Sequence, residues 1–390
     1  MAGFFPVFFK SYWIQGFSSV ESTATLGTTI GISSLLIAII SPTLGAVSDL
    51  KNLKKKLLIF FMVIGILSCF GLSLLSSGQW LAATVLYGIS MMAFNASCTF
   101  YDSLLPYVAS EEETDFISAL GYSLGYLGGG VLFLLNVLMY LFPARFGFEN
   151  GVQAVKFSFF SVSLWWFVFS LPLMYFVKEP QGKVSERFNL VKLTHQSYLM
   201  LKATLKDILQ NKNLFYFMLA FWLYIDGVYT VISMAVDYGI SLNFEAKDLI
   251  AALLITQFVG FPSTFFFGVI AKRWGCKIPI ILCIGIYSVT IVLATQMSKP
   301  IHFYILAMII GLAQGGVQSL SRSLFAKMIP KEKSGEYFGF MNLIGKFASI
   351  LGPFIVALTV TLTGKSNLGL MGLLVLFILG VFFLLKVKSE

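Results

Sequence analysis

Long apolar runs follow one another along this chain, separated by short polar or glycine-containing stretches. Two clear examples are Leu57–Leu75 and Leu368–Leu385. A helix needs about 20 apolar residues to cross the hydrocarbon core of a bilayer, which matches the length of these runs. They are continuous and do not alternate with the period of two that marks strands of a membrane barrel. Helices that satisfy their own backbone hydrogen bonds in lipid are therefore predicted.

The pattern predicts eleven full membrane-spanning helices. Their expected ranges are about 27–48, 57–76, 80–105, 118–141, 153–177, 213–237, 248–271, 278–297, 301–328, 337–362 and 367–386. Residues Met1–Ile14 are also apolar, but they reach only about two-thirds of the length of a span. We interpret them as the outer part of a truncated first helix whose inner part is absent from this sequence. The predicted fold class is an all-α polytopic membrane protein.

The longest hydrophilic stretch runs from Lys178 to Lys212 and divides the spans into two groups of six, counting the partial one. We predict an N-terminal bundle at 1–177, a basic linker at 178–212 that is helical from Leu190 to Leu209, and a C-terminal bundle at 213–390. One constant offset also recurs between the two halves. It relates Gly45 to Gly268, Gly88 to Gly311, Asn95 to Gln318 and Glu113 to Glu336. Such a repeat indicates two pseudo-symmetric bundles around a central site.

Composition supports the membrane assignment: 57% of the residues are hydrophobic, 12% are charged, and the mean hydropathy is +0.86. A soluble domain needs a larger polar fraction to cover its surface. The net charge of +9 does not indicate a nucleic-acid partner. Most of the basic residues fall in alternate loops, as the positive-inside rule requires. This bias predicts that the linker and the C-terminus are cytoplasmic; a bacterial inner membrane is the expected location.

The sequence offers little for catalysis or metal binding. Cys69, Cys98, Cys276 and Cys283 are scattered, and the two histidines are isolated. These spacings match neither a zinc site nor a disulfide framework, and no phosphate-binding loop or nucleophile elbow is present. We therefore expect no cofactor, no metal and no enzymatic activity, and we expect a monomer.

Several motifs resemble a known superfamily. Gly45 and Asp49, followed by Lys54-Lys55-Lys56, resemble the loop between helices two and three of the major facilitator superfamily. The second copy has Gly268 and Arg273 but places Lys272 where an aspartate is expected. The resemblance implies a major facilitator fold in which this loop helps to latch the two halves on the inner side. Gly45, Asp49, Gly268 and Arg273 are thus candidate gate residues.

A narrower resemblance covers almost the whole chain. It is carried by Phe100-Tyr101-Asp102-Ser103-Leu104-Leu105-Pro106, by the glycine cluster 125–130 and by the segment Gln314–Ser323. These segments are similar to the branch named for the autophagy-related vacuolar amino-acid effluxers, which has many bacterial members. The resemblance implies amino-acid export. Tyr101 and Asp102, at the inner end of their helix, are further gate candidates, and a cap on the inner gate is favoured there over substrate contact.

Charged groups are expensive inside a bilayer, so each requires a partner, a wet cavity or a function. Asp226 lies in the middle of its predicted span, and Thr230 follows it on the same helical face. One hypothesis makes Asp226 a coupling carboxylate that carries a proton. The alternative makes it a buried structural acid paired with a base. Lys346 is a candidate ionic partner, or else it binds a lipid phosphate or a loop acid.

A second polar stripe occupies the predicted span 301–328. Gln314, Gln318 and Arg322 are spaced four residues apart, beside a stripe of small residues that suits close helix packing. An arginine grips a carboxylate in a bidentate way, which suits an anionic or amino-acid substrate. The alternative is that Arg322 lies near the inner interface and snorkels. Asn95, which the offset relates to Gln318, completes the substrate candidates.

These observations lead to one hypothesis and two rivals. We predict a secondary active transporter, a symporter or antiporter, that moves a small solute such as an amino acid by alternating access with proton coupling. The first rival is a membrane receptor or assembly factor that keeps the fold without transporting. The second is a carrier of lipid or lysolipid. A solute carrier is expected to place polar stripes inside, whereas a lipid carrier is expected to have a lateral apolar opening.

Overall fold

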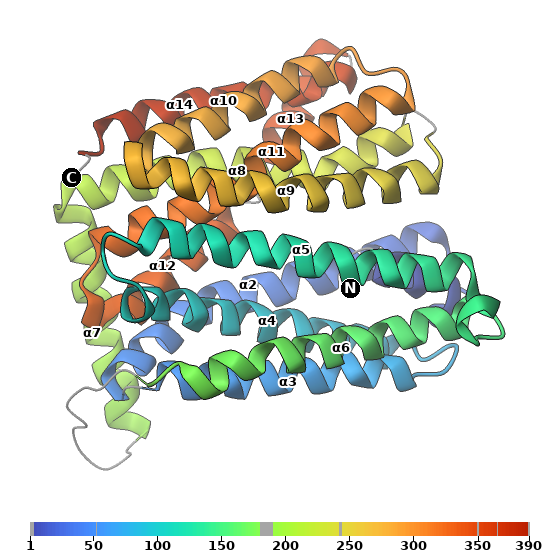
Figure 1. Cartoon of the computed structure of the whole chain (residues 1–390), viewed down its shortest axis with the longest axis horizontal. Coiled ribbons are helices and arrows are strands. Elements are labelled where there is room, and N and C mark those ends of the chain that lie inside the picture. The colour runs from blue at the N-terminus through green and yellow to red at the C-terminus, as the bar shows by residue number, and fades with distance from the viewer. Residues whose placement is uncertain are drawn as a thin grey trace. The chain divides into compact units, whose positions relative to one another are not determined.

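The computed structural model describes residues 4–51, 53–179, 190–241, 244–348, 351–364 and 366–388. Within these ranges every regular element is helical (Figure 1). The α-helices are α1 (Phe5–Phe8), α2 (Ser19–Lys51), α3 (Lys54–Leu74), α4 (Trp80–Val108), α5 (Thr114–Leu141), α6 (Gly151–Phe176), α7 (Leu190–Gln210), α8 (Lys212–Ser241), α9 (Ala246–Trp274), α10 (Lys277–Ala294), α11 (Pro300–Met328), α12 (Ser334–Phe347), α13 (Leu351–Thr363) and α14 (Leu374–Lys386). Short π or 3-10 helices are η1 (Phe9–Trp13), η2 (Pro143–Phe146), η3 (Lys331–Lys333) and η4 (Ser366–Leu373).

Eleven spans in the described part of the chain are long and apolar enough to cross a membrane. The all-α polytopic fold expected from the hydropathy pattern is confirmed. The linker helix expected from Leu190 is also present as α7, although residues 180–189 of the predicted linker lie outside the described residues.

One predicted boundary is wrong, and one predicted span differs in helix type over its first residues. The first full span begins at Ser19 and not near residue 27. The predicted helix 367–386 begins as the 3-10 helix η4 and becomes α-helical only at Leu374. The predicted helix 337–362 lies within one candidate span, Lys331–Thr363, which contains α12 and α13; residues 349–350 between these two helices lie outside the described residues.

The chain forms two compact units, each of which gathers segments that are distant in sequence. Unit 1 comprises residues 1–104, 131–198 and 335–340. Unit 2 comprises residues 105–130, 199–334 and 341–390. The first part of α5 therefore belongs to unit 2, and the first residues of α12 belong to unit 1. The two-bundle division at 177 and 213 stays a prediction.

The core of unit 1 is built largely from aromatic side chains near the start of the chain. Phe5 and Trp13 are fully buried, and Phe5 stacks on Tyr87 of α4 with ring centroids 3.7 Å apart. Trp13 also packs against Phe159 of α6 at 5.5 Å. Gly16, at a positive φ of 82°, then turns the chain into α2. The apolar segment at the start of the chain thus packs as core, and α3 and α6 run alongside each other in the same unit.

Unit 2 is held together by close helix approaches at small residues. α11 packs along α9 and α10, and α8 packs along α14 (Figure 1). A Cβ added to Gly311 would lie 3.0 Å from the backbone oxygen of Thr256 in α9. A Cβ on Gly316 would lie 2.8 Å from the Phe267 ring and 2.9 Å from the sulfur of Cys283. The small-residue stripe of α11 therefore packs against neighbouring helices, as its spacing predicts.

Candidate functional site

A buried carboxylate of unit 2 faces the first residues of α13. Asp226, in the middle of α8, is 0% exposed. Its Oδ2 accepts the backbone N–H of Leu351 at 3.1 Å, and its Oδ1 accepts that of Gly352 at 2.8 Å. Thr230, one turn further along α8, donates its hydroxyl to Oδ1 at 3.4 Å. Asp226 thus caps the start of α13 from another helix.

Two physical effects favour this arrangement. The first N–H groups of a helix have no partner within the helix, and a carboxylate can accept their hydrogen bonds. The partial positive charge of the helix start also stabilises a negative group placed there. Gly352 permits the approach, because a Cβ at this position would lie 1.9 Å from Oγ1 of Thr230 and 2.7 Å from Oδ1 of Asp226. The carboxylate is therefore held by backbone dipoles in a membrane-spanning segment.

Arg322 forms a second buried cluster in unit 2. This α11 side chain is 4% exposed. Its Nε donates to Oγ of Ser118 at 2.9 Å, and its Nη2 donates to the backbone oxygen of Ser118 at 3.0 Å. The guanidinium carbon also lies 4.7 Å from the centre of the Tyr122 ring, a cation–π distance. Both partners lie on the part of α5 that belongs to unit 2, so Arg322 is buried among α5 groups.

The same end of α5 carries an ion pair. Lys327 Nζ lies 2.7 Å from Oδ2 of Asp115, whose side chain is 4% exposed.

The thiol of Cys276, in the loop between α9 and α10, lies 3.2 Å from the Ser323 hydroxyl. Burial raises the pKa of the Cys276 thiol, and the nearby Asp115 carboxylate raises this pKa further. The thiol is therefore neutral at physiological pH, which does not suit a nucleophile.

We expect Arg322→Lys to lower the free energy of unfolding by about 1–3 kcal/mol, because lysine cannot reproduce the two directed N–H donors of the buried guanidinium. Thermal unfolding in detergent, followed by tryptophan fluorescence, measures the effect. Arg273→Lys is the matched control, because Arg273 is exposed in the last turn of α9 and its replacement should leave the transition unchanged. Unfolding of Arg322→Lys at the wild-type temperature would contradict this account.

Further residues of α5 and α11 also contact one another in unit 2, towards the C-terminal end of α5 and the N-terminal end of α11 from Arg322. The Tyr126 side chain interacts with Gln314, and its ring lies against Gly260 and Gly315. Gln314 and Gln318 are both half-buried. Sequence reasoning did not select Ser118, Tyr122 or Tyr126 as site residues. Their spacing of four residues along one face of α5 was the signal that could have identified them.

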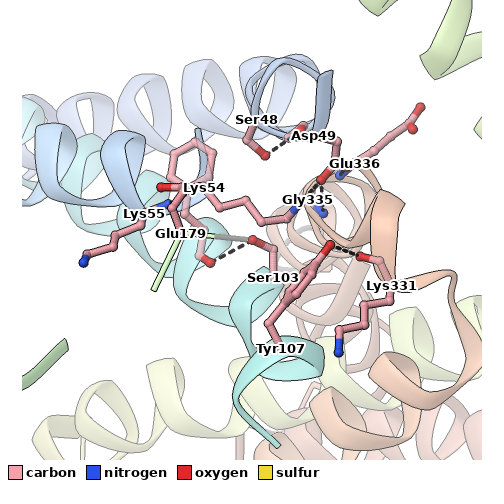
Figure 2. A network of polar contacts seen from close by, with 12 residues as sticks. Ser48, Asp49, Lys54, Lys55, Ser103, Tyr107, Glu179, Lys331, Gly335 and Glu336 are labelled. Carbon is pink, nitrogen blue, oxygen red and sulfur yellow. Dashed lines mark hydrogen bonds and ion pairs between the residues drawn. The ribbon is translucent and has the colours of Figure 1, made fainter. Parts of the chain in front are cut away.

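Unit 1 contains the polar network of the α2–α3 loop (Figure 2). Asp49, near the end of α2, forms an ion pair with Lys54 at the start of α3. Its Oδ1 accepts the N–H of Gly335 at 3.1 Å, and its Oδ2 accepts that of Glu336 at 2.8 Å. Asp49 and Lys54 each have side chains that are 2% exposed. Asp49 thus joins the α2–α3 loop to the first turn of α12.

A glycine and a second carboxylate complete this network. A Cβ on Gly45 would lie 2.1 Å from the backbone oxygen of Gly335, so only glycine fits at this contact. Glu179 accepts the backbone N–H groups of Lys55 and Lys56, each at 3.2 Å. The N-terminus of α3 therefore has a carboxylate cap, which its macrodipole favours.

The remaining candidates lie in other surroundings. A Cβ on Gly268 would lie 2.5 Å from Cβ of Ala119, so Gly268 makes a close helix contact within unit 2. Asn95 donates its side-chain amide to the backbone oxygen of Met91 at 2.7 Å. Tyr101 is 42% exposed on α4. Asp102 on α4 and Lys346 in the last turn of α12 are each half-buried, and the Asp226–Lys346 ion pair stays a prediction.

Comparison with known proteins identifies close relatives across the whole chain. The model of the family described as "Vacuole effluxer Atg22 like" matches residues 11–390. The chain is 37% identical to the uncharacterized MFS-type transporter YxiO of Bacillus subtilis, over 99% of this chain and 90% of that protein. It is 25% identical to autophagy-related protein 22 of Saccharomyces cerevisiae, over 86% of this chain and 72% of that protein.

Solved structures show the same fold. The proton:xylose symporter XylE, a major facilitator protein, superposes with a TM-score of 0.74 at 14% identity, covering 99% of this chain and 91% of that one. A bacterial homologue of the iron transporter ferroportin, in an outward-facing state, superposes with a TM-score of 0.64 at 13% identity, covering 100% and 94% of the two chains. The fold is therefore the major facilitator fold.

Proposed function

The chain belongs to the Atg22-like vacuole effluxer family and is an MFS-type transporter, and from this premise we propose that it exports amino acids by proton-coupled alternating access. The observation that carries the proposal is the buried carboxylate of Asp226, which lies in a span and faces the start of α13. A membrane-embedded acid of this kind requires a function or a compensating partner. The family description supports export of a solute.

The surroundings of Asp226 suit a group that changes its protonation. Its ionised form is stabilised by the N–H groups of Leu351 and Gly352. Protonation weakens both bonds, so it loosens the link between α8 and the start of α13. We propose that this loosening couples proton uptake to the movement of α13.

Lys346 and Arg322 have different parts in this proposal. Lys346, in the last turn of α12, provides a positive group for the amino-acid carboxylate or for Asp226. Arg322 holds α5 against α11 through Ser118. Its bonds support a gating role for Arg322 in place of direct substrate contact.

The test is counterflow of a panel of radiolabelled amino acids in proteoliposomes, with and without a pH gradient. We expect exchange of at least one amino acid and accumulation that follows the gradient. Asp226→Asn keeps the shape of the side chain and one oxygen that can accept a hydrogen bond, but its amide cannot carry a proton. Its accumulation should fall to the level of protein-free liposomes while exchange continues. Asp207→Asn, an exposed acid on α7, is the matched control and should behave like wild type.

Other outcomes would overturn the proposal in distinct ways. Wild-type accumulation by Asp226→Asn would remove the coupling role. If folded protein, shown by cooperative unfolding, exchanges none of the amino acids, the proposal that amino acids are the substrates is refuted. Movement of fluorescent phospholipid in the same vesicles would then favour the lipid carrier, and its absence would favour the receptor.

A further inference from the structure

α7 is a long helix that does not cross the membrane yet lies next to one that does. It spans Leu190–Gln210 and is not among the eleven candidate spans of the described chain. α8, a span, begins at Lys212, so only Asn211 separates the two helices. The end of α7 therefore lies at the membrane surface. Its side chains are described from Ser197 onward.

One face of α7 packs on the protein. Ser197 is 0% exposed, Thr204 is 1% exposed and Ile208 is 5% exposed. Their spacing of seven and four residues places them on one stripe of the helix. This stripe anchors α7 and fixes its rotation about its own axis, so the directions of the other faces are defined.

An exposed apolar stripe lies about a quarter turn from the packing face. It consists of Tyr198, Leu205 and Leu209, which are 63%, 47% and 58% exposed. The spacing of seven and four residues again places them together. Large apolar side chains on a helix beside a bilayer bury this surface in the boundary between headgroups and acyl chains.

A basic stripe follows next around the helix. Lys202 and Lys206 are exposed, one turn apart, at the edge of the apolar stripe. Ala203, Asp207 and Gln210 lie further round and are also exposed. Leu199, 51% exposed, is the apolar exception on this side. Around the helix, the face that packs on the protein is thus followed by the apolar stripe, the basic stripe and a polar face.

We propose that α7 lies in the membrane interface and binds anionic phospholipid headgroups through Lys202 and Lys206. In this position Tyr198, Leu205 and Leu209 enter the acyl boundary, while the lysine stems follow the apolar stripe and their ammonium groups reach the phosphates. Anionic leaflets attract such lysines electrostatically. The partner is a lipid surface, and the inference does not depend on which solute the protein moves.

The first measurement is the depth of single spin labels on the full chain in nanodiscs, in a variant whose four native cysteines are replaced. Labels at 205 and 209 should be accessible to oxygen and shielded from a water-soluble relaxant. Labels at 203 and 210 should show the reverse. If all four positions are equally open to the aqueous relaxant, α7 does not lie in the interface and the proposal fails.

The second measurement tests the headgroup. A fluorophore at position 205 is quenched by brominated phosphatidylglycerol or by brominated phosphatidylcholine, each diluted in phosphatidylcholine. We expect stronger quenching by the anionic lipid, and a preference that falls about fivefold for each of Lys202→Gln and Lys206→Gln. Lys299→Gln, an exposed lysine before α11, is the matched control and should leave the preference unchanged. Equal quenching by the two lipids in wild type would refute the headgroup assignment.

Discussion

Asp49→Ala is expected to lower the free energy of unfolding by about 3–5 kcal/mol. The substitution removes the carboxylate that forms an ion pair with Lys54, and Lys54 is a buried lysine that is only 1% exposed. It also removes the acceptor for the N–H groups of Gly335 and Glu336. Thermal unfolding of purified protein, followed by tryptophan fluorescence, should show a large decrease in the transition temperature.

Two further variants separate these contributions. Lys54→Met in the Asp49→Ala background removes the buried ammonium group as well, so it should recover part of the loss. Asp49→Asn keeps an oxygen that can accept from the first turn of α12, so it should be less damaging than alanine. If Asp49→Ala/Lys54→Met is no more stable than Asp49→Ala, the buried ion pair is not the cause of the loss.

Gly352→Ala is expected to destabilise unit 2 by about 1–3 kcal/mol and to abolish proton-driven accumulation. The new methyl group would lie 1.9 Å from Oγ1 of Thr230 and 2.7 Å from Oδ1 of Asp226, so the carboxylate could no longer reach the start of α13. Thermal unfolding and accumulation in proteoliposomes measure the two effects. Adding Thr230→Ala should restore part of the stability, since it removes the nearest clashing atom.

Gly285→Ala is the matched control for this substitution. Gly285 lies within α10, and a Cβ there would meet nothing within 4 Å. Alanine has the higher helix propensity, so the control should be neutral or slightly stabilising. A Gly352→Ala protein as stable and as active as Gly285→Ala would show that the approach of Asp226 to α13 is not needed.

The number and type of the helices followed from the sequence, because hydropathy over about 20 residues reports a requirement of the bilayer itself. Continuous apolar runs such as Leu57–Leu75 identify a span by their own composition, without any knowledge of the helices that pack against them. The linker helix α7 was also predictable, since its apolar positions recur with helical period.

The sequence by itself determined the class of this protein, its spans, the loop that carries Asp49 and the residues that resemble one transporter branch. Only the tertiary structure decided what the charged groups bind. Asp49 meets backbone N–H groups 286 and 287 positions away, and Asp226 meets those 125 and 126 positions away. Backbone donors cannot be located from the sequence, since every residue except proline has a backbone N–H. The partners of a buried charge therefore become visible only when packing brings a helix terminus to it.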